Sequence, residues 1–104
     1  MINVLFWNCR GIRGEPTRRV LRELCRLHRP TLVCIAEPMV DFSSISSGFW
    51  SSLDLRLVGM NDRGGLILTN WVFACASTSY CFTFDRFSGA LVHFCLCEHF
   101  YSGS

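Results

Sequence analysis

The feature that most constrains the fold is a strand, helix and strand pattern at the start of the chain. Two runs of β-branched, aromatic and aliphatic residues, Ile2 to Trp7 and Thr31 to Ala36, are typical of buried strands. Between them, Arg18 to His28 has apolar residues at helical spacing. Pro16, just before this segment, suits the first turn of a helix, and Pro30 ends the helix. A right-handed crossover makes two such strands parallel neighbours. The sequence therefore predicts a βαβ unit and an α/β fold.

The predicted helix has an apolar face and a charged face. Glu23 can form weak ion pairs with Arg19 and Arg26 on the charged face. Arginine suits phosphate binding because it donates two parallel hydrogen bonds, but a run of charges more often marks a solvated face, so both interpretations stay open. The apolar face consists of Val20, Leu21, Leu24 and Leu27, and seven of the ten arginines lie before residue 31, namely Arg10, Arg13, Arg18, Arg19, Arg22, Arg26 and Arg29.

Polar residues stand at the ends of both predicted strands. Asn8 follows the first strand and Glu37 follows the second. Parallel strands end at the same edge of a sheet, where open α/β folds commonly build their sites. Asn8 and Glu37 are therefore expected to lie together as a candidate site. The alternative is that Asn8 only starts a turn and Glu37 ends a strand in solvent.

The rest of the chain is less clearly patterned. Asp41 to Ser52 is rich in serine and predicts a loop anchored by Phe49 and Trp50. Leu53 to Met60 and Leu66 to Thr69 flank a turn sequence and predict a β-hairpin, and Leu91 to Phe100 alternates like a strand.

The composition excludes disorder and disulfide scaffolds. The chain is 50% hydrophobic, and its net charge of +2 is too small to indicate a nucleic-acid partner by itself. An apolar run of roughly 20 residues and a secretory signal are both absent from the sequence, so we expect no membrane insertion and no secretion. The seven cysteines are an odd number without a CxxC pair, which favours buried thiols.

The opening sequence Ile-Asn-Val-Leu-Phe-Trp-Asn-Cys-Arg-Gly-Ile (2–12) resembles the start of the endonuclease/exonuclease/phosphatase domain of plant non-LTR (LINE-type) retrotransposons. The segment His-Arg-Pro-Thr-Leu-Val-Cys-Ile-Ala-Glu (28–37) is similar to the family segment that ends in a metal-binding glutamate. Asn-Asp-Arg-Gly-Gly (61–65) and Ala-Ser-Thr-Ser-Tyr (76–80) resemble later blocks, but their close spacing predicts an internal deletion around residues 71–73. The resemblance covers residues 1–80 and leaves 81–104 unassigned.

The resemblance implies a fold and an activity. The implied fold is a four-layer α/β sandwich of two mixed sheets with helices outside, of which residues 1–104 would form one partial domain. The implied activity is Mg²⁺-dependent hydrolysis of a DNA phosphodiester, in the nucleus or cytoplasm. Glu37 would bind the metal, Asn8 would position the metal or the phosphate, and Arg10 and Arg13 would contact DNA.

Departures from the family pattern imply lost activity. The chain has no Gly-Asp-x-Asn block and no Ser-Asp-His block, and Cys75 stands where the family carries a tyrosine that reaches toward phosphate. Loss of several groups that act together removes most hydrolytic rate. We therefore expect a catalytically inactive nuclease fragment. The alternative is a non-enzymatic remnant that binds a partner through its arginine-rich helix.

In the final segment, four alternating residues that could bind zinc, His93, Cys95, Cys97 and His99, would share one face of a strand. The geometry of a strand argues against a zinc site there. Alternate residues on a strand are about 6.6 Å apart, whereas zinc ligands converge to within about 2.3 Å of one ion. Asp85 with His93 matches no catalytic motif. A sheet that lacks its second half also leaves an unpaired edge and an uncovered apolar face, which predicts poor solubility.

Overall fold

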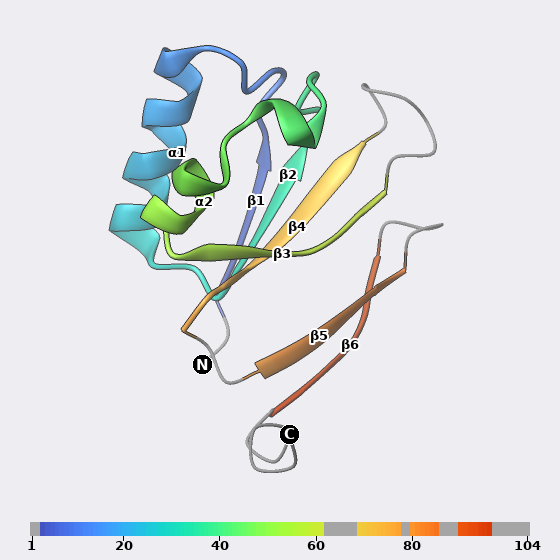
Figure 1. The fold of residues 1–104 in the computed structure, drawn as a ribbon. Coiled ribbons are helices and arrows are strands. Elements are labelled where there is room, and N and C mark those ends of the chain that lie inside the picture. Colours follow the sequence, from blue (N-terminus) through green and yellow to red (C-terminus); the bar gives the residue numbers. More distant parts are fainter. Residues whose placement is uncertain (1–2, 62–68, 78–79, 86–89, 97–104) are drawn as a thin grey trace.

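The predicted βαβ unit is present at the start of the chain (Figure 1). Strand β1 (Val4–Asn8), helix α1 (Glu15–His28) and strand β2 (Leu32–Ala36) follow one another, and β1 pairs with β2 in parallel. In this computed structural model the described residues are 3–61, 69–77, 80–85 and 90–96. Within them, no helix is long and apolar enough to cross a membrane.

The central sheet has four strands in the order β1-β2-β4-β3. Strand β4 (Asn70–Cys75) is antiparallel both to β2 and to β3 (Leu55–Asn61). The sheet is therefore mixed, and with two helices it forms a small α+β domain. Strands β5 (Tyr80–Asp85) and β6 (Ala90–Leu96) form a separate antiparallel pair, with β5 beside β3.

Both helices cover the same face of the central sheet, as Figure 1 shows. Leu21 of α1 and Phe49 and Trp50 of α2 (Ser47–Ser52) belong to one buried cluster with alternate residues of β2 and β4. Trp50 stacks on Phe73 with ring centroids 4.3 Å apart. Such stacking stabilises the fold in addition to the burial of the two rings. The buried sheet residues of this cluster are Val33, Ile35, Leu55, Trp71 and Phe73.

The opposite face of the sheet carries a smaller buried cluster of Leu32, Val72 and Ala74. On the edge strand β1, however, Val4 and Phe6 are 58% and 67% exposed. No described strand pairs with the outer edge of β1. Among the described strands, the expected unpaired edge is present at β1, but the expected uncovered apolar face is limited to β1, because Leu32, Val72 and Ala74 are buried.

Two sequence predictions about local structure were wrong. The serine-rich segment is not an irregular loop, because it contains a 3-10 turn (Phe42–Ser44) and helix α2, whose N-cap Ser46 accepts a hydrogen bond from the N–H of Phe49. On α1, Val20 and Leu27 are exposed, and Cys25 packs against the core instead. The predicted β-hairpin is present, since β3 and β4 pair antiparallel, but its second strand is Asn70–Cys75; of the predicted strand, residues 66–68 are outside the described part and Thr69 is not in a strand.

Candidate functional site

Asn8 and Glu37 meet at the edge where β1 and β2 end. The Asn8 amide Nδ2 donates a hydrogen bond of 2.7 Å to Glu37 Oε2. Backbone hydrogen bonds continue the contact beyond the strands, from Gly11 N–H to the Glu37 carbonyl at 2.9 Å and from Ile12 N–H to the Pro38 carbonyl at 2.9 Å. The expectation that Asn8 and Glu37 lie together is therefore confirmed. The alternative, that Asn8 only starts a turn and Glu37 only ends a strand in solvent, does not account for their hydrogen bond.

The backbone at this edge is held in an uncommon conformation. Glu37, Met39 and Arg10 have φ values of 52°, 63° and 51°, in the left-handed region that side chains other than glycine seldom adopt. Gly11, at φ 112°, occupies a region open to glycine almost alone. Such residues cost roughly 1–3 kcal/mol each and cluster at functional sites. No sequence signal indicates this strain at Glu37, because the residue before a proline ordinarily avoids helical conformations.

The Asn8 and Glu37 side chains offer oxygen donors to a hard cation. Oε1 of Glu37 and Oδ1 of Asn8 are not engaged in the hydrogen bond between them. Within the described residues no group of three or more His, Cys, Asp or Glu converges on a point, so a cation here would keep several waters. Mg²⁺ is commonly held in this way by one or two carboxylates. The residues therefore fit a weakly held, hydrated Mg²⁺.

Cys9 follows Asn8, and its side chain contacts the backbone at the end of β2. Its Sγ lies 3.5 Å from the carbonyl oxygens of both Ala36 and Glu37. Burial raises the pKa of the Cys9 thiol above its ordinary value, and the charge of Glu37 adds a smaller increase. A raised pKa favours the protonated thiol at neutral pH. Cys9 is only partly buried, whereas the sequence favoured buried thiols.

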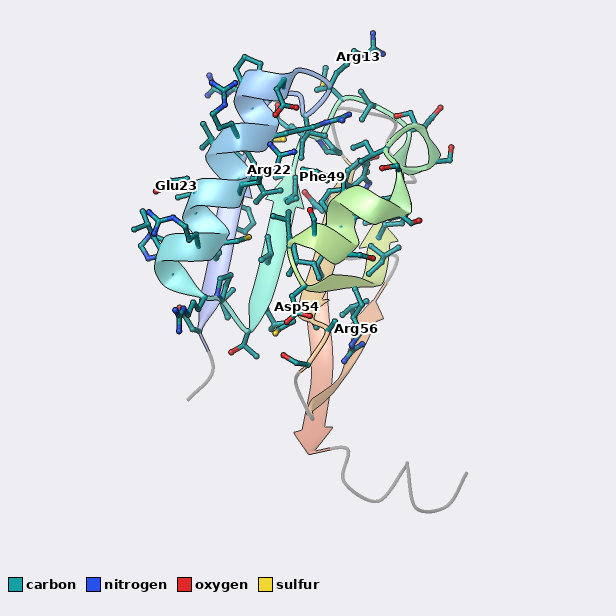
Figure 2. The ribbon with its side chains drawn as sticks, turned by 60° about the vertical axis from the view of Figure 1, so that its left-hand side comes forward. Arg13, Arg22, Glu23, Phe49, Asp54 and Arg56 are labelled. Carbon is teal, nitrogen blue, oxygen red and sulfur yellow. The ribbon has the colours of Figure 1, made fainter. Side chains whose placement is uncertain are left out.

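The two predicted DNA contacts, Arg10 and Arg13, are exposed residues of the segment that joins β1 to α1. Figure 2 shows Arg13 projecting away from the rest of the molecule. The hydrogen bond from Gly11 to Glu37 holds this segment against the candidate site. Both arginines are thus free of the core, but no described contact joins either guanidinium to Asn8 or Glu37.

The arginines of α1 are mostly engaged within the molecule. Arg18 Nε donates to the Ile12 carbonyl at 3.0 Å, and the guanidinium carbons of Arg18 and Arg22 lie 5.5 and 5.3 Å from the centroid of the Phe49 ring. Arg22 also pairs with Glu15 at 2.7 Å, and Arg26 pairs with Glu23. The predicted Glu23 pair with Arg26 is confirmed; in α1 the second ion pair is Arg22 with Glu15, and not Arg19 with Glu23.

Cys75 lies at the opposite end of the strands from Glu37, because β4 runs antiparallel to β2 and its last residues lie beside the start of β2. Its N–H donates to the Thr31 carbonyl at 2.9 Å, and its Sγ lies 3.2 Å from Asp54 Oδ2 and 3.1 Å from Ser77 Oγ. A shallow cavity of about 240 Å³ at this edge is lined in part by Cys75 and Asp54. Cys75, which the resemblance aligns with a phosphate-facing tyrosine, is therefore at the other end of the strands from the Asn8 and Glu37 pair.

Sequence reasoning missed two further polar residues at the Glu37 edge. Asn70, the first residue of β4, pairs in register with Ala36, and Asn61, the last residue of β3, pairs with Asn70. The N–H of Glu37 also donates to the Thr69 carbonyl at 3.2 Å. Only the strand order reveals this proximity, since no local pattern shows that β4 runs back along β2.

The remaining predictions concern the C-terminal segment. Asp85, His93 and Cys95 lie on β5 and β6, whose backbone pairing is described but whose side chains are outside the described part. Cys97 and His99 are outside the described residues altogether.

Comparisons of the chain with protein-family models, with curated proteins and with solved structures find no match.

Proposed function

We propose that this chain is part of an endonuclease/exonuclease/phosphatase domain of the retrotransposon type, in which Asn8 and Glu37 hold Mg²⁺ against a DNA phosphate. We further propose that the chain does not cleave DNA as it stands. The observation that carries the first part is the 2.7 Å hydrogen bond between Asn8 and Glu37, which joins the two sequence blocks that most resemble the family.

The arrangement of layers supports the proposed fold. Helices α1 and α2 pack on one face of the mixed sheet, and the pair β5-β6 lies beside β3, outside that helical layer. A four-layer sandwich needs one helical layer and one sheet of this kind in each half. The described elements are compatible with one such half.

Each site residue has a separate role in the proposed function. Glu37 supplies the negative charge that holds the cation, and Asn8 orients that carboxylate by donating to Oε2. The bound Mg²⁺ would polarise the phosphate and stabilise charge on its oxygens. Arg10 and Arg13, both exposed, would contact the DNA backbone and position the duplex without reading its sequence.

The proposed lack of cleavage follows from what the site does not contain. Cys9 stays protonated, and its Sγ already lies against two backbone carbonyls. Within the described residues no group of three or more His, Cys, Asp or Glu surrounds the site, so it lacks a cluster that could both hold a cation and activate an attacking water. Since the Gly-Asp-x-Asn and Ser-Asp-His blocks are also absent, the expected behaviour is cation and DNA binding without hydrolysis.

The alternative of a binding module that acts through the arginine-rich helix gains no support from the contacts of α1. Arg18, Arg22 and Arg26 all have partners within the chain, and two of them contact Phe49 of α2. Arg18 and Arg22 contact Phe49 and so stabilise the packing of the two helices, and a partner that bound them would have to displace these contacts.

Two measurements on one pair of variants test the proposal. Mn²⁺, a paramagnetic substitute for Mg²⁺, is titrated into the chain, into Glu37→Gln and into the control Glu23→Gln, whose carboxylate is exposed on α1. We expect Glu37→Gln to weaken Mn²⁺ binding roughly tenfold or more, and Glu23→Gln to leave it unchanged. Equal affinities in all three proteins would overturn the assignment of Glu37.

Nicking of supercoiled plasmid in Mg²⁺ tests the second part of the proposal, that the chain does not cleave DNA. We expect no nicking by the chain or by either variant. Nicking by the chain that disappears in Glu37→Gln would establish a working metal site and refute the proposed inactivity. Nicking that persists in Glu37→Gln would indicate a contaminating nuclease, which repeated purification would remove.

A further inference from the structure

Four strand ends at the Glu37 edge place three asparagines in one row. Asn8 pairs in register with Ala36, Ala36 with Asn70, and Asn70 with Asn61. Residues in register on neighbouring strands project from the same face of a sheet. The row therefore runs across the whole sheet, with Glu37 one residue beyond Ala36.

The face that carries this row is the one without helices. Along β4, Trp71 and Phe73 belong to the cluster under α1 and α2, whereas Val72 and Ala74 belong to the cluster on the opposite face. Because side chains alternate along a strand, Asn70 shares the face of Val72 and Ala74. It is the first residue of β4, at the end of that face, and it is half-buried and not enclosed in the core.

The spacing of the row suits a ligand larger than one ion. Asn8 and Asn70 are separated by two strand spacings, roughly 9.6 Å. Between them stands Ala36, whose methyl group takes little of that width. The Asn8 end has the Glu37 carboxylate and suits a hydrated cation. At the other end, the amide of Asn70 has two N–H donors, which match phosphate oxygens.

We propose that Asn70 is a binding residue of this site, and that its amide donates to a non-bridging oxygen of the DNA phosphate that the cation at Asn8 and Glu37 attracts. This assignment rests on the proposed function, since it takes the cation and the phosphate from it. It adds a contact from β4 that none of the segments resembling the family contains.

The experiment follows side-chain amides directly. A short DNA duplex in Mg²⁺ is titrated into the isotope-labelled chain, and the NH₂ signals of Asn8, Asn70 and Asn3 are recorded. Asn3 is an internal control, since it lies at the other end of β1, where its Nδ2 donates to the His28 carbonyl at 2.6 Å. We expect shifts at Asn8 and Asn70 and none at Asn3.

The outcomes separate this inference from the function on which it rests. A shift at Asn8 without one at Asn70 would overturn the role of Asn70 and leave the proposed function standing. No shift at either asparagine would overturn both. If all three shift equally, the duplex binds without a defined site and the inference fails.

Substitutions at Asn70 give a second measurement. We expect Asn70→Ala to raise the Kd for the duplex about tenfold or more, the value of one hydrogen bond to a charged group, and to leave Mn²⁺ affinity unchanged. Asn70→Asp should weaken DNA binding further, because a carboxylate repels phosphate. A loss of Mn²⁺ affinity in Asn70→Ala, with the fold intact by circular dichroism, would make Asn70 a cation ligand and contradict the phosphate contact.

Discussion

The side-chain amide of Asn8 donates a 2.7 Å hydrogen bond to the carboxylate of Glu37, across 29 residues of sequence. The hydrogen bond links the ends of two parallel strands, and the backbone pairing of these strands already brings the two side chains close together. An amide beside a carboxylate attracts it, whereas a second carboxylate at the same place would repel it. The choice of asparagine at residue 8 therefore permits a charged Glu37 without a cation.

Replacing Asn8 by aspartate tests this relationship. Two carboxylates would then face each other, and we expect Asn8→Asp to lower the free energy of unfolding by about 1 kcal/mol at pH 7, a modest value because the pair is exposed. The loss should shrink as pH falls through the carboxylate range, where one group takes up a proton, and on addition of Mg²⁺. Urea denaturation at pH 7 and pH 4 measures it.

The control for this prediction is Asn8→Ala, which removes the hydrogen bond without adding charge. Its effect on unfolding should change less between pH 7 and pH 4 than that of Asn8→Asp. If Asn8→Asp were no more sensitive to pH and to Mg²⁺ than Asn8→Ala, the side chain at residue 8 would not face Glu37.

The positive φ of Glu37 predicts an unusual order of stability among its variants. At φ 52° a side chain clashes with its own backbone, and glycine relieves the clash. We expect Glu37→Gly to be more stable than Glu37→Ala by about 1 kcal/mol, although glycine ordinarily destabilises a fold. Urea denaturation of the two variants gives the difference. Alanine as the more stable variant would show that Glu37 is not in the left-handed region.

The sequence predicted the βαβ unit because its information is local. The apolar runs of β1 and β2 and the placement of Pro16 and Pro30 are local sequence features, and the meeting of Asn8 with Glu37 follows from the parallel pairing of β1 and β2. The Asn8 and Glu37 pair of the candidate site could therefore be predicted from the amino-acid sequence alone.

The errors arose where tertiary packing decides the structure. Helix α2 has only six residues, too few to be stable alone, and it forms because Phe49 and Trp50 pack into the core. Similarly, Asn70 lies beside Ala36 at the Glu37 end of the sheet only because β4 returns between β2 and β3. Neither event has a local signature. The resemblance to a nuclease family predicted the pair but did not include Asn70.

The ion pair between Glu15 and Arg22 predicts a pH dependence of stability. The hydrogen bond from Arg22 holds the pKa of Glu15 below its ordinary value of 4.5. A carboxyl whose pKa is lowered by folding stabilises the folded state above its unfolded pKa, and that contribution disappears as pH falls through the folded pKa. We expect Glu15→Gln to have a lower Tm than the unmodified chain at pH 7 and the same Tm at pH 3.

Arg22→Gln provides the contrast to Glu15→Gln. It removes the ion pair and also the contact of the guanidinium with the Phe49 ring, 5.3 Å from the ring centroid, which does not depend on pH in this range. Its Tm should therefore stay below that of the unmodified chain at pH 3 as well. Equal Tm values at pH 3 for all three proteins would mean that the Phe49 contact contributes nothing.

The exposed edge of β1 predicts self-association that one substitution can reduce. Phe6, 67% exposed, lies at the centre of an edge strand that contains no charged residue. Such strands pair with other chains unless a charge blocks them. We expect Phe6→Lys to reduce the fraction of oligomer in size-exclusion chromatography with little change in urea stability. Val20→Lys, at an exposed apolar residue of α1, should leave association unchanged, because a helix offers no free backbone groups to a strand. An equal reduction by both variants would attribute association to net charge and not to the β1 edge.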